Sequence, residues 1–227
     1  MSKLLYVVGT DTGIGKTVVS LLIMQYLFSK GFNPFYLKPF QTGCSSPIDI
    51  DSDARFIYTY VPKLMGKDPS LSVGYCFKNP KAPYFSAIDD RKKIDIKFIK
   101  DIIKKQAIDH SHIVIEGSGG LLVPVTDNIL IIDTIRIFEA TPILIAKAGL
   151  GTINHTLLSL EALINRNMKP LAIILVNNDN TPSSMIKENM QAIKMFSGIE
   201  VIGVVNNIRD FYYIENDKFA FLDNINL

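Results

Sequence analysis

Residues 9–17 read GTDTGIGKT, and this stretch decides the fold. The preceding run Leu4–Val8 is apolar and has the length of a buried strand, and helical periodicity follows over Val18–Lys30. Glycines in a strand-to-helix turn let successive backbone N–H groups point at phosphate oxygens, and the positive helix end adds to the attraction. The stretch therefore predicts a phosphate-binding loop, in which Lys16 reaches the β- and γ-phosphates of a nucleotide and Thr17 ligates magnesium.

The loop departs in one position from the common phosphate-loop pattern. That pattern has a glycine where this chain has Thr10, with Gly9 one residue earlier. The alternative interpretation is an ordinary strand–turn–helix connection that happens to contain Gly-Lys-Thr. We favour a variant phosphate loop, because the triplet, the strand and the helix coincide.

The alternation of strands and helices continues along the chain. Further apolar runs predict buried strands at Phe35–Lys38, His112–Ile115, Pro142–Ala146, Leu171–Val176 and Val201–Val205. Helical periodicity recurs over Ile94–Ile108, Ile153–Asn165 and Pro182–Phe196, and Gly31 is placed to cap the first helix.

This order of elements predicts a three-layer α/β fold of the phosphate-loop NTPase type, with a mostly parallel central sheet. We expect one domain over residues 1–227, with ligands at the carboxyl ends of the strands. Residues 39–93 are rich in Pro, Gly and Asp and are expected to contain long loops. No structure is assigned to residues 209–227.

The composition narrows the class of protein. Of 227 residues, 48% are hydrophobic, and Lys and Arg number 24 against 22 Asp and Glu. This excludes collagen-like and broadly disordered chains, and we expect no nucleic-acid partner. No apolar run approaches the roughly 20 residues of a membrane helix, so we expect a cytoplasmic protein without a membrane partner. Free thiols are favoured for Cys44 and Cys76, although a bridge between them stays open.

Two acidic residues are candidate magnesium ligands. Glu116 follows the strand run 112–115 and opens EGSGG, where a carboxylate can approach a metal while the backbone approaches a substrate. A solvated loop charge is the alternative for Glu116. Asp53 lies in DIDSDAR, just ahead of an expected helix through Tyr60. Helix capping and metal binding are equally open for Asp53.

Lys38 is a second candidate cation. It begins KPFQTG, in which Pro39 is expected to stop the strand and Gly43 to permit a turn. Lys38 should therefore emerge at the same sheet edge as Lys16. Two lysines at one site suit a reaction that accumulates negative charge beyond the phosphates. Taken alone, a lysine at this position is more often a surface lysine at a strand end.

Together these segments resemble the dethiobiotin synthetases, ATP-dependent carboxylases that close the ureido ring in biotin synthesis. The motifs that match in order and spacing are GTDTGIGKT at 9–17, KPFQTG at 38–43, SDA at 52–54, EGSGG at 116–120 and GLGTINHTLL at 149–158. The resemblance extends from the N-terminus to about residue 205. The phosphate loop alone would indicate only a broad NTPase class, and the combination makes the resemblance specific.

The resemblance implies a reaction with ATP as co-substrate and Mg²⁺ as cofactor. Carbon dioxide and one amine of 7,8-diaminononanoate form a carbamate, whose oxygen attacks the γ-phosphate of ATP. The second amine then closes the ring on the carbonic–phosphoric anhydride and releases phosphate. No histidine or cysteine nucleophile is required.

The resemblance also implies roles by motif position. Lys38 would hold the carbamate and the transferring phosphate, with Lys16 stabilising the phosphates. The implied magnesium ligands are Thr17, Asp53 and Glu116. The implied ATP-binding residues are Gly13, Ile14, Gly15, Lys16, Thr17, Val18, Asp53, Glu116, Gly117, Ser118, Gly119 and Asn178. The implied substrate-binding residues are Thr12, Thr42, Gly151 and Asn154.

Two of these assignments carry further implications. In the family, the segment that matches residues 149–155 lies at a homodimer interface, where a helix start receives the substrate carboxylate from the neighbouring subunit. A plain helix capped by Thr152 is the alternative. Asn178 matches an adenine-contacting asparagine, with a shift to Asn177 left open. Residues 206–208, Asn-Asn-Ile, replace the family's proline and bulky residue, so nucleotide selectivity stays open.

We also consider two other functions for this chain. Another ligase of the same superfamily, such as a cobyrinic-acid amidating enzyme, would need a glutaminase segment that we do not find. A partitioning ATPase would need a basic DNA-facing surface or an amphipathic membrane tail. The candidate basic cluster is Arg91, Lys92, Lys93, Lys97, Lys100, Lys104 and Lys105. Its lysines alternate with apolar positions of one helix, which favours a solvated face.

Overall fold

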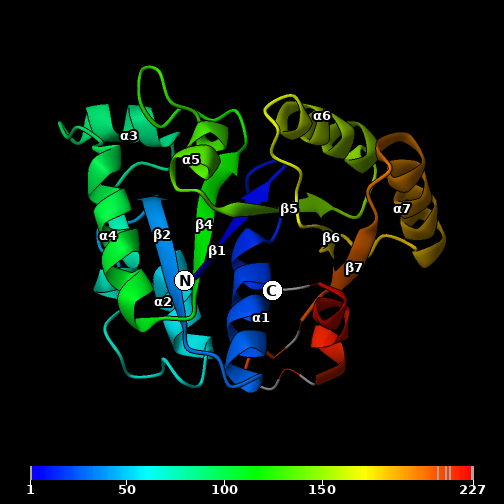
Figure 1. The fold of residues 1–227 in the computed structure, drawn as a ribbon, viewed down its shortest axis with the longest axis horizontal. Helices are drawn as coiled ribbons and strands as arrows, with labels where there is room; N and C mark the ends of the chain where they lie inside the picture. Colours follow the sequence, from blue (N-terminus) through cyan, green and yellow to red (C-terminus); the bar gives the residue numbers. More distant parts are fainter. Residues whose placement is uncertain (1, 209, 213, 215, 226–227) are drawn as a thin grey trace.

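Seven parallel strands form one sheet in the computed structural model, in the order β3-β2-β4-β1-β5-β6-β7 (Figure 1). The structure describes residues 2–208, 210–212, 214 and 216–225. The strands are β1 Lys3–Gly9, β2 Pro34–Thr42, β3 Val73–Phe77, β4 His112–Gly120, β5 Thr141–Lys147, β6 Ala172–Asn177 and β7 Val201–Asn206. The helices are α1 Lys16–Ser29, α2 Asp53–Tyr60, α3 Pro83–Asp89, α4 Ile96–Asp109, α5 Ile131–Ile137, α6 Thr152–Ile164 and α7 Ser183–Ser197, with 3₁₀ turns η1 Pro69–Ser72 and η2 Asn216–Asn224.

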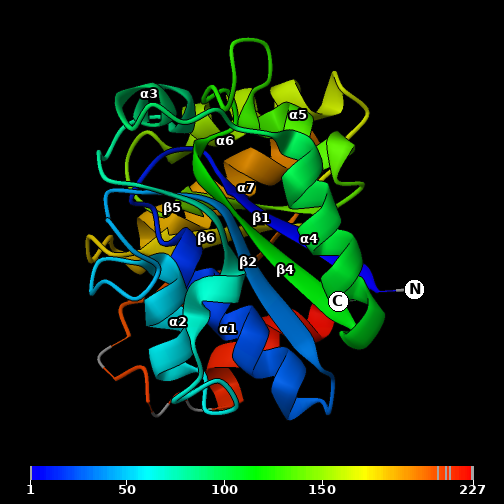
Figure 2. The same cartoon turned by 90° about the vertical axis from the view of Figure 1, so that its left-hand side faces the viewer.

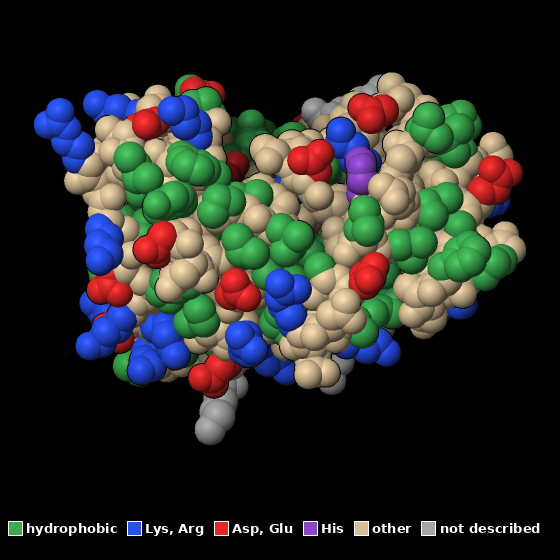
Figure 3. Space-filling model, turned by 90° about the horizontal axis from the view of Figure 1, so that it is seen from above, with side chains coloured by type: hydrophobic (Ala, Val, Ile, Leu, Met, Phe, Trp, Pro, Cys, Tyr) green, Lys and Arg blue, Asp and Glu red, His purple; other side chains and the backbone are tan. Residues whose placement is uncertain are grey.

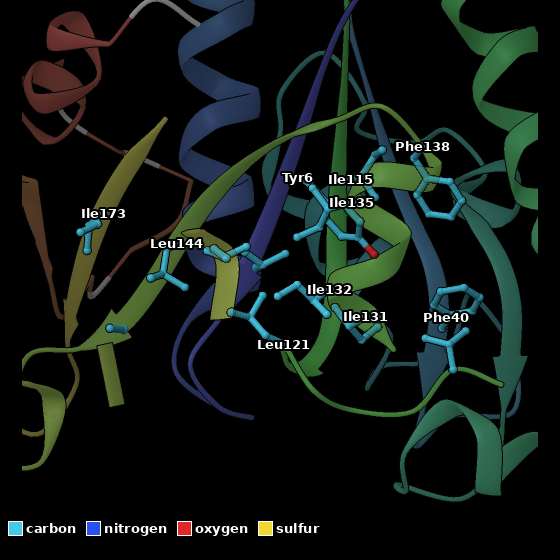
Figure 4. Packing of buried hydrophobic residues seen from close by; sticks show 14 of the residues in the cluster. Tyr6, Phe40, Ile115, Leu121, Ile131, Ile132, Ile135, Phe138, Leu144 and Ile173 are labelled. Atoms are coloured by element: carbon cyan, nitrogen blue, oxygen red, sulfur yellow. The ribbon is translucent and has the colours of Figure 1, made fainter. Parts of the chain in front are cut away.

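Helices cover both faces of the sheet, which gives the predicted three layers (Figure 2). Along β1, Leu5 and Val7 pack with α1 and α2, whereas Tyr6 and Val8 pack with the opposite layer. This alternation is the two-residue period of a strand that is buried on both faces. Figure 4 shows the second layer, where Tyr6 lies beside Ile135 of α5. The α/β prediction is therefore confirmed, with every strand pair parallel.

The predicted strand and helix runs are confirmed to within a few residues at their ends, and Gly31 follows α1 with φ of 82°. Residues 39–93 contain the expected loops, such as residues 43–52, together with α2, β3 and α3. The expected strand end at Pro39 was wrong. Pro39 does not stop β2, which continues to Thr42. Beyond Leu37 this strand pairs with the edge strand β3 and not with β4, so the missing N–H of proline is tolerated there.

The topology brings the phosphate loop to a reversal in strand order. From β1 the chain passes first to β2 and β3 on one side of β1, and later to β5, β6 and β7 on the other. Ligand sites in open parallel sheets lie at the carboxyl ends of strands beside such a reversal. The residues after β1, and those at the ends of β2 and β4, therefore meet at one edge.

The segment after β7 packs back against the α1 layer. Phe219 and Leu222 of η2 are buried there, and the Phe221 ring lies where a Cβ on Gly203 would stand. Among the described residues, no helix combines the length and the apolar character needed to cross a membrane.

Candidate active site

The phosphate loop has the left-handed backbone that its glycines permit. Gly15 adopts φ of 97° directly before α1, and a Cβ at this position would lie 2.8 Å from Cγ1 of Val176. A side chain at residue 15 would therefore meet both backbone strain and the end of β6. The Lys16 ammonium folds back over the loop and donates to the Asp11 carbonyl at 2.7 Å.

Three oxygen-bearing side chains from separate elements meet beside the loop. The Thr17 hydroxyl at the start of α1 lies 3.0 Å from Asp53 Oδ1 and 2.8 Å from Glu116 Oε1. Asp53 is the first residue of α2, but Ser52 accepts the capping hydrogen bond from the Arg55 N–H. The Asp53 carboxylate thus faces the site. Glu116 lies inside β4 and not after it, because this strand continues to Gly120.

Lys38 links the two carboxylates. Its Nζ lies 2.6 Å from Asp53 Oδ2 and 2.9 Å from Glu116 Oε1, and it also donates to the Gly117 carbonyl at 3.2 Å. Lys38 is 4% exposed and Glu116 is 1% exposed. A buried ion pair needs such complete pairing, since either charge alone would bear its full desolvation cost.

Burial and charge shift the pKa values of the site in opposite directions. Burial lowers the pKa of Lys16 to about 8, and the nearby Lys38 ammonium adds to this fall. Burial also disfavours the charged form of Lys38, but Asp53 and Glu116 outweigh it and raise the Lys38 pKa above the ordinary lysine value. Burial would raise the Asp53 pKa, yet the Lys38 ammonium holds it below the ordinary value. Lys38 is thus a fixed cation, whereas the charge of Lys16 responds to pH and to bound anions.

These groups line one pocket of about 240 Å³. The predicted site residues that it brings together are Thr12, Gly13, Gly15, Lys16, Thr17, Lys38, Thr42, Asp53, Glu116, Ser118 and Gly119. Ile14 and Val18 flank the loop outside the pocket lining, with the Ile14 side chain buried in the core, and Gly117 contributes the carbonyl that Lys38 reaches. A larger hollow, of about 530 Å³ beside Phe32 and Ile108, lies at the opposite end of the strands, where β1 and β4 begin.

Three further pocket neighbours were missed by the sequence analysis. The Tyr36 hydroxyl donates to Glu116 Oε2 at 2.8 Å, and burial together with Glu116 raises the Tyr36 pKa well above its ordinary value. Gln41 accepts the Asp53 backbone N–H at 3.1 Å, and Asp51 joins the pocket lining. Strand alternation offered a signal for Tyr36, since residues two apart in β2 share a face with Lys38.

The remaining predicted residues lie apart from this pocket. Gly151 and Asn154, at the start of α6, and Asn178, after β6, are all exposed. Asn177 is buried, and both ends of its amide are engaged, with Oδ1 accepting the Thr181 N–H at 2.8 Å and Nδ2 donating to the Thr181 carbonyl at 3.2 Å. Asn177 therefore shapes the turn that presents Asn178.

A second hollow, of about 420 Å³, lies between the phosphate loop and α6. It shares Thr12 with the first pocket and is also lined by Leu122, His155 and Leu158. Leu122 and Leu158 are more than half exposed, and Leu150 is 94% exposed. Leu150 before α6 and Leu158 on it thus expose apolar surface, and Figure 3 shows hydrophobic side chains spread over the face seen from above.

The basic cluster on α4 behaves as a solvated face. Ile99 and Ile103 are buried under the helix, whereas Lys97, Lys104 and Lys105 are exposed. In Figure 3 the Lys and Arg side chains toward the α3 and α4 side are interspersed with Asp and Glu.

Comparisons with known proteins agree with this geometry. A family profile described as an AAA domain matches residues 3–212. A protein of Methanococcus vannielii named ATP-dependent dethiobiotin synthetase BioD is 34% identical, over 92% of this chain and 96% of its own length. Proteins of the same name from Hydrogenobaculum and Clostridium acetobutylicum are 37% and 32% identical, over 76% and 97% of this chain and 76% and 90% of their own.

Some solved structures with low sequence identity are similar to this chain in fold alone. A putative plasmid partition protein of Borrelia burgdorferi bound to AMPPNP superposes with a TM-score of 0.59 at 13% identity, covering 99% of this chain and 97% of its own. A ParA family ATPase of Chlorobium tepidum gives 0.57 at 12% identity, covering 92% and 87%. The partitioning ATPases therefore share the architecture of this chain.

Proposed function

The chain belongs to the dethiobiotin synthetase family and is an ATP-dependent ligase, and we propose that it carboxylates 7,8-diaminononanoate with carbon dioxide and closes the product to dethiobiotin. One observation carries the proposal. Lys16, Thr17, Lys38, Asp53 and Glu116, from four separate points in the sequence, converge on a single pocket next to the phosphate loop.

Magnesium fits the oxygen atoms at this pocket. Thr17, Asp53 and Glu116 offer a hydroxyl and two carboxylates, the hard donors that Mg²⁺ prefers. Among the described residues, no group of three or more His, Cys, Asp or Glu could hold a metal alone. That agrees with Mg²⁺, which commonly uses one or two carboxylates together with substrate phosphates. A bound Mg²⁺ would neutralise charge on the phosphates and align the γ-phosphate for transfer.

Lys16 and Lys38 contact different anionic groups of the substrates. Lys16, on the phosphate loop, binds the β- and γ-phosphates of ATP. Lys38, at 4% exposure and paired with two carboxylates, is held where the carbamate oxygen meets the γ-phosphate. A carbamate and a triphosphate repel each other, and fixed cations in a site with little water lower that repulsion without reorganising during the reaction.

The diamine occupies the side of the pocket lined by Thr12 and Thr42. Their hydroxyls orient the amine that becomes the carbamate. After phosphate transfer, the second amine attacks the activated carbonyl, the ring closes, and phosphate leaves. Holding both reactants in one cleft removes much of the entropic cost of their encounter.

The far end of the diamine, its carboxylate, requires a site beyond this pocket. We assign it to Gly151 and Asn154 at the start of α6 of a second copy, so that the working unit is a homodimer. The exposed Leu150 and Leu158 beside them support this arrangement, since a second copy would cover these side chains. The free thiols of Cys44 and Cys76 are consistent with a reducing cytoplasm. The cytoplasmic location stays a prediction.

A product assay tests the proposal. The purified protein is incubated with MgATP, bicarbonate and 7,8-diaminononanoate, and dethiobiotin is sought by mass spectrometry. Product that requires all three substrates is the expected result. ATP hydrolysis that ignores the diamine and rises with DNA would instead favour a partitioning ATPase.

A further inference from the structure

The two cysteines of this chain, Cys44 and Cys76, lie together where β2 ends beside β3. Their Sγ atoms are 3.3 Å apart, and the Cys76 thiol also donates to the Cys44 carbonyl at 3.2 Å. Cys44 stands two residues after Thr42, and Cys76 is in the neighbouring strand β3. Neither cysteine belongs to the proposed catalytic machinery.

The backbone around the pair is already held at a distance that suits a cross-link. In the β2–β3 ladder, Gln41 is the register partner of Cys76 and Thr42 that of Phe77. The Cys44 N–H continues this contact, donating to the Phe77 carbonyl at 3.3 Å. A disulfide has an S–S bond of about 2.05 Å, so the sulfurs need to approach by only about 1.3 Å, within reach of side-chain rotation.

We propose that Cys44 and Cys76 form a dithiol modification site that reacts with low-molecular-weight disulfides and closes to an intramolecular disulfide. The Cys76 thiolate attacks the reagent disulfide, forming a mixed disulfide and releasing one reagent thiol. The Cys44 thiolate then attacks Sγ of Cys76 and expels the second reagent thiol. Two electrons pass to the reagent, and the two cysteine protons end on the released thiols.

The order of attack follows from exposure. Burial raises the pKa of both thiols, to about 12 for Cys44 with a contribution from the Cys76 sulfur, but Cys44 is buried whereas Cys76 is half-buried. A reagent from solvent therefore meets Cys76 first, and Cys44 acts as the resolving thiol inside the protein. The ring that the disulfide closes contains Asp53 and the whole of α2. The bond would therefore restrict the movement of the segment between Thr42 and the Asp53 carboxylate.

The test uses the full-length protein in buffers with rising ratios of oxidised to reduced glutathione. Remaining thiols are trapped with N-ethylmaleimide after denaturation and counted by intact mass. We expect the two thiols to disappear together, in a monomeric chain without a glutathione adduct, and to return with dithiothreitol. The oxidised protein should also melt several degrees higher, because the bond restricts the unfolded chain.

Single variants serve as matched controls. Cys44→Ser should keep a glutathione adduct on Cys76 and show no rise in melting temperature, and Cys76→Ser should react far more slowly at the buried Cys44. Thermal melts of both reduced variants establish that they fold. The proposal fails if the wild-type protein retains two thiols, stops at a stable adduct on Cys76, or cross-links only between chains on a non-reducing gel.

Discussion

The two ends of the proposed site differ in how completely one chain builds them. At the phosphate end, Lys16, Lys38 and Glu116 are at most 6% exposed, and each has a polar partner within 2.9 Å. At the end proposed to receive the substrate carboxylate and the nucleotide base, Asn154 and Asn178 are exposed, on segments outside the pocket. The first end is assembled by the fold, whereas the second presents side chains to whatever binds there.

Solvation explains the difference. Charges that the fold removes from water must be paired within the same chain, or the desolvation cost opposes folding. Exposed amides and glycines meet no such demand, and water satisfies them until a ligand or a second chain arrives. Variants at the phosphate end should therefore change both stability and turnover, and variants at the other end should change substrate affinity alone.

The largest effect is expected for Lys38→Met. Turnover should fall by about 10²–10³-fold, because a preorganised cation is lost where charge develops. Affinity for ATP should change little, since the phosphate loop supplies most ground-state contacts. The free energy of unfolding should also fall, by about 3–5 kcal/mol, because the buried Glu116 and the partly buried Asp53 lose their cation. Steady-state kinetics, nucleotide titration and urea denaturation measure the three quantities.

An exposed ion pair with the same N–O distance as Lys38–Asp53 provides the control for Lys38. Lys81 Nζ lies 2.6 Å from Asp89 Oδ2, but the Lys81 side chain is 55% exposed. Lys81→Met should change the unfolding free energy by less than about 1 kcal/mol and leave turnover intact. Equal losses in the two variants would contradict the importance given to burial, and normal turnover in Lys38→Met would refute its role.

Tyr36→Phe is expected to have the next largest effect. It removes the hydroxyl that fixes Glu116 Oε2 and leaves the ring in place. Loss of a residue that orients a metal-binding carboxylate commonly costs about 10–100-fold in metal affinity or activity. Mg²⁺ dependence of turnover and of ATP binding would report this loss.

The control for Tyr36 is Tyr6→Phe. Tyr6 is also fully buried, and its hydroxyl bonds to Thr134 Oγ1 at 2.9 Å, outside the pocket lining and without a bond to Glu116. Both variants should lose stability by about 1 kcal/mol for the lost hydrogen bond. A shift in Mg²⁺ dependence confined to Tyr36→Phe identifies a positioning residue, and the same shift in both variants would mean general destabilisation.

The same contrast between buried and exposed residues determines how much of the fold and of the site could be predicted from the sequence. Fully buried strands such as β1, β5 and β6 are continuous apolar runs, and a glycine-rich turn before a helix has few other structural meanings. These features located the layers and the phosphate end. The edge strand β3 was missed because Val73–Phe77 is short, contains Gly74 and is only partly buried.

Side-chain pairing was harder to predict than the elements. Thr17 and Glu116 are 99 residues apart, and only strand order reveals that they touch. Asp53 could equally have capped α2, and the neighbouring Ser52 decides the question by taking the cap. At the other end of the proposed site, Gly151 and Asn154 could be placed by family resemblance alone, because exposed residues carry no packing constraint.

A pH titration sharpens the comparison within the phosphate end. The Lys16 pKa is lowered to about 8 in the free protein, first by burial and then by Lys38, while Glu116, Asp53 and Asp11 act in the opposite sense. Bound phosphate favours the charged ammonium and raises this pKa. Above pH 8 binding must therefore take up a proton, so the Kd for ADP in EDTA should rise by up to about tenfold per pH unit.

Lys16→Arg should flatten this profile, because guanidinium stays charged over the whole range. Calorimetry at pH 9 in two buffers of different ionisation enthalpy measures the proton uptake directly. A wild-type Kd that is constant between pH 7 and pH 9.5 would show that the Lys16 ammonium is charged throughout, in spite of its burial.

The smallest effect on the free chain is expected for Asn154→Ala. This side chain is exposed, so the unfolding free energy should stay within about 0.5 kcal/mol of wild type, as for Gln191→Ala, an exposed amide on α7. If Asn154 receives the diamine carboxylate, KM for the diamine should rise by about tenfold or more, the cost of one hydrogen bond to a charged group, with KM for ATP unchanged.

A mixture of Asn154→Ala and Lys38→Met then tests whether the two ends of the site come from one chain or from two. Activity that recovers toward a quarter of the wild-type level would arise only from mixed dimers whose pocket takes Lys38 from one copy and Asn154 from the other. Activity no higher than the sum of the two separate variants would place both ends of the site on the same chain.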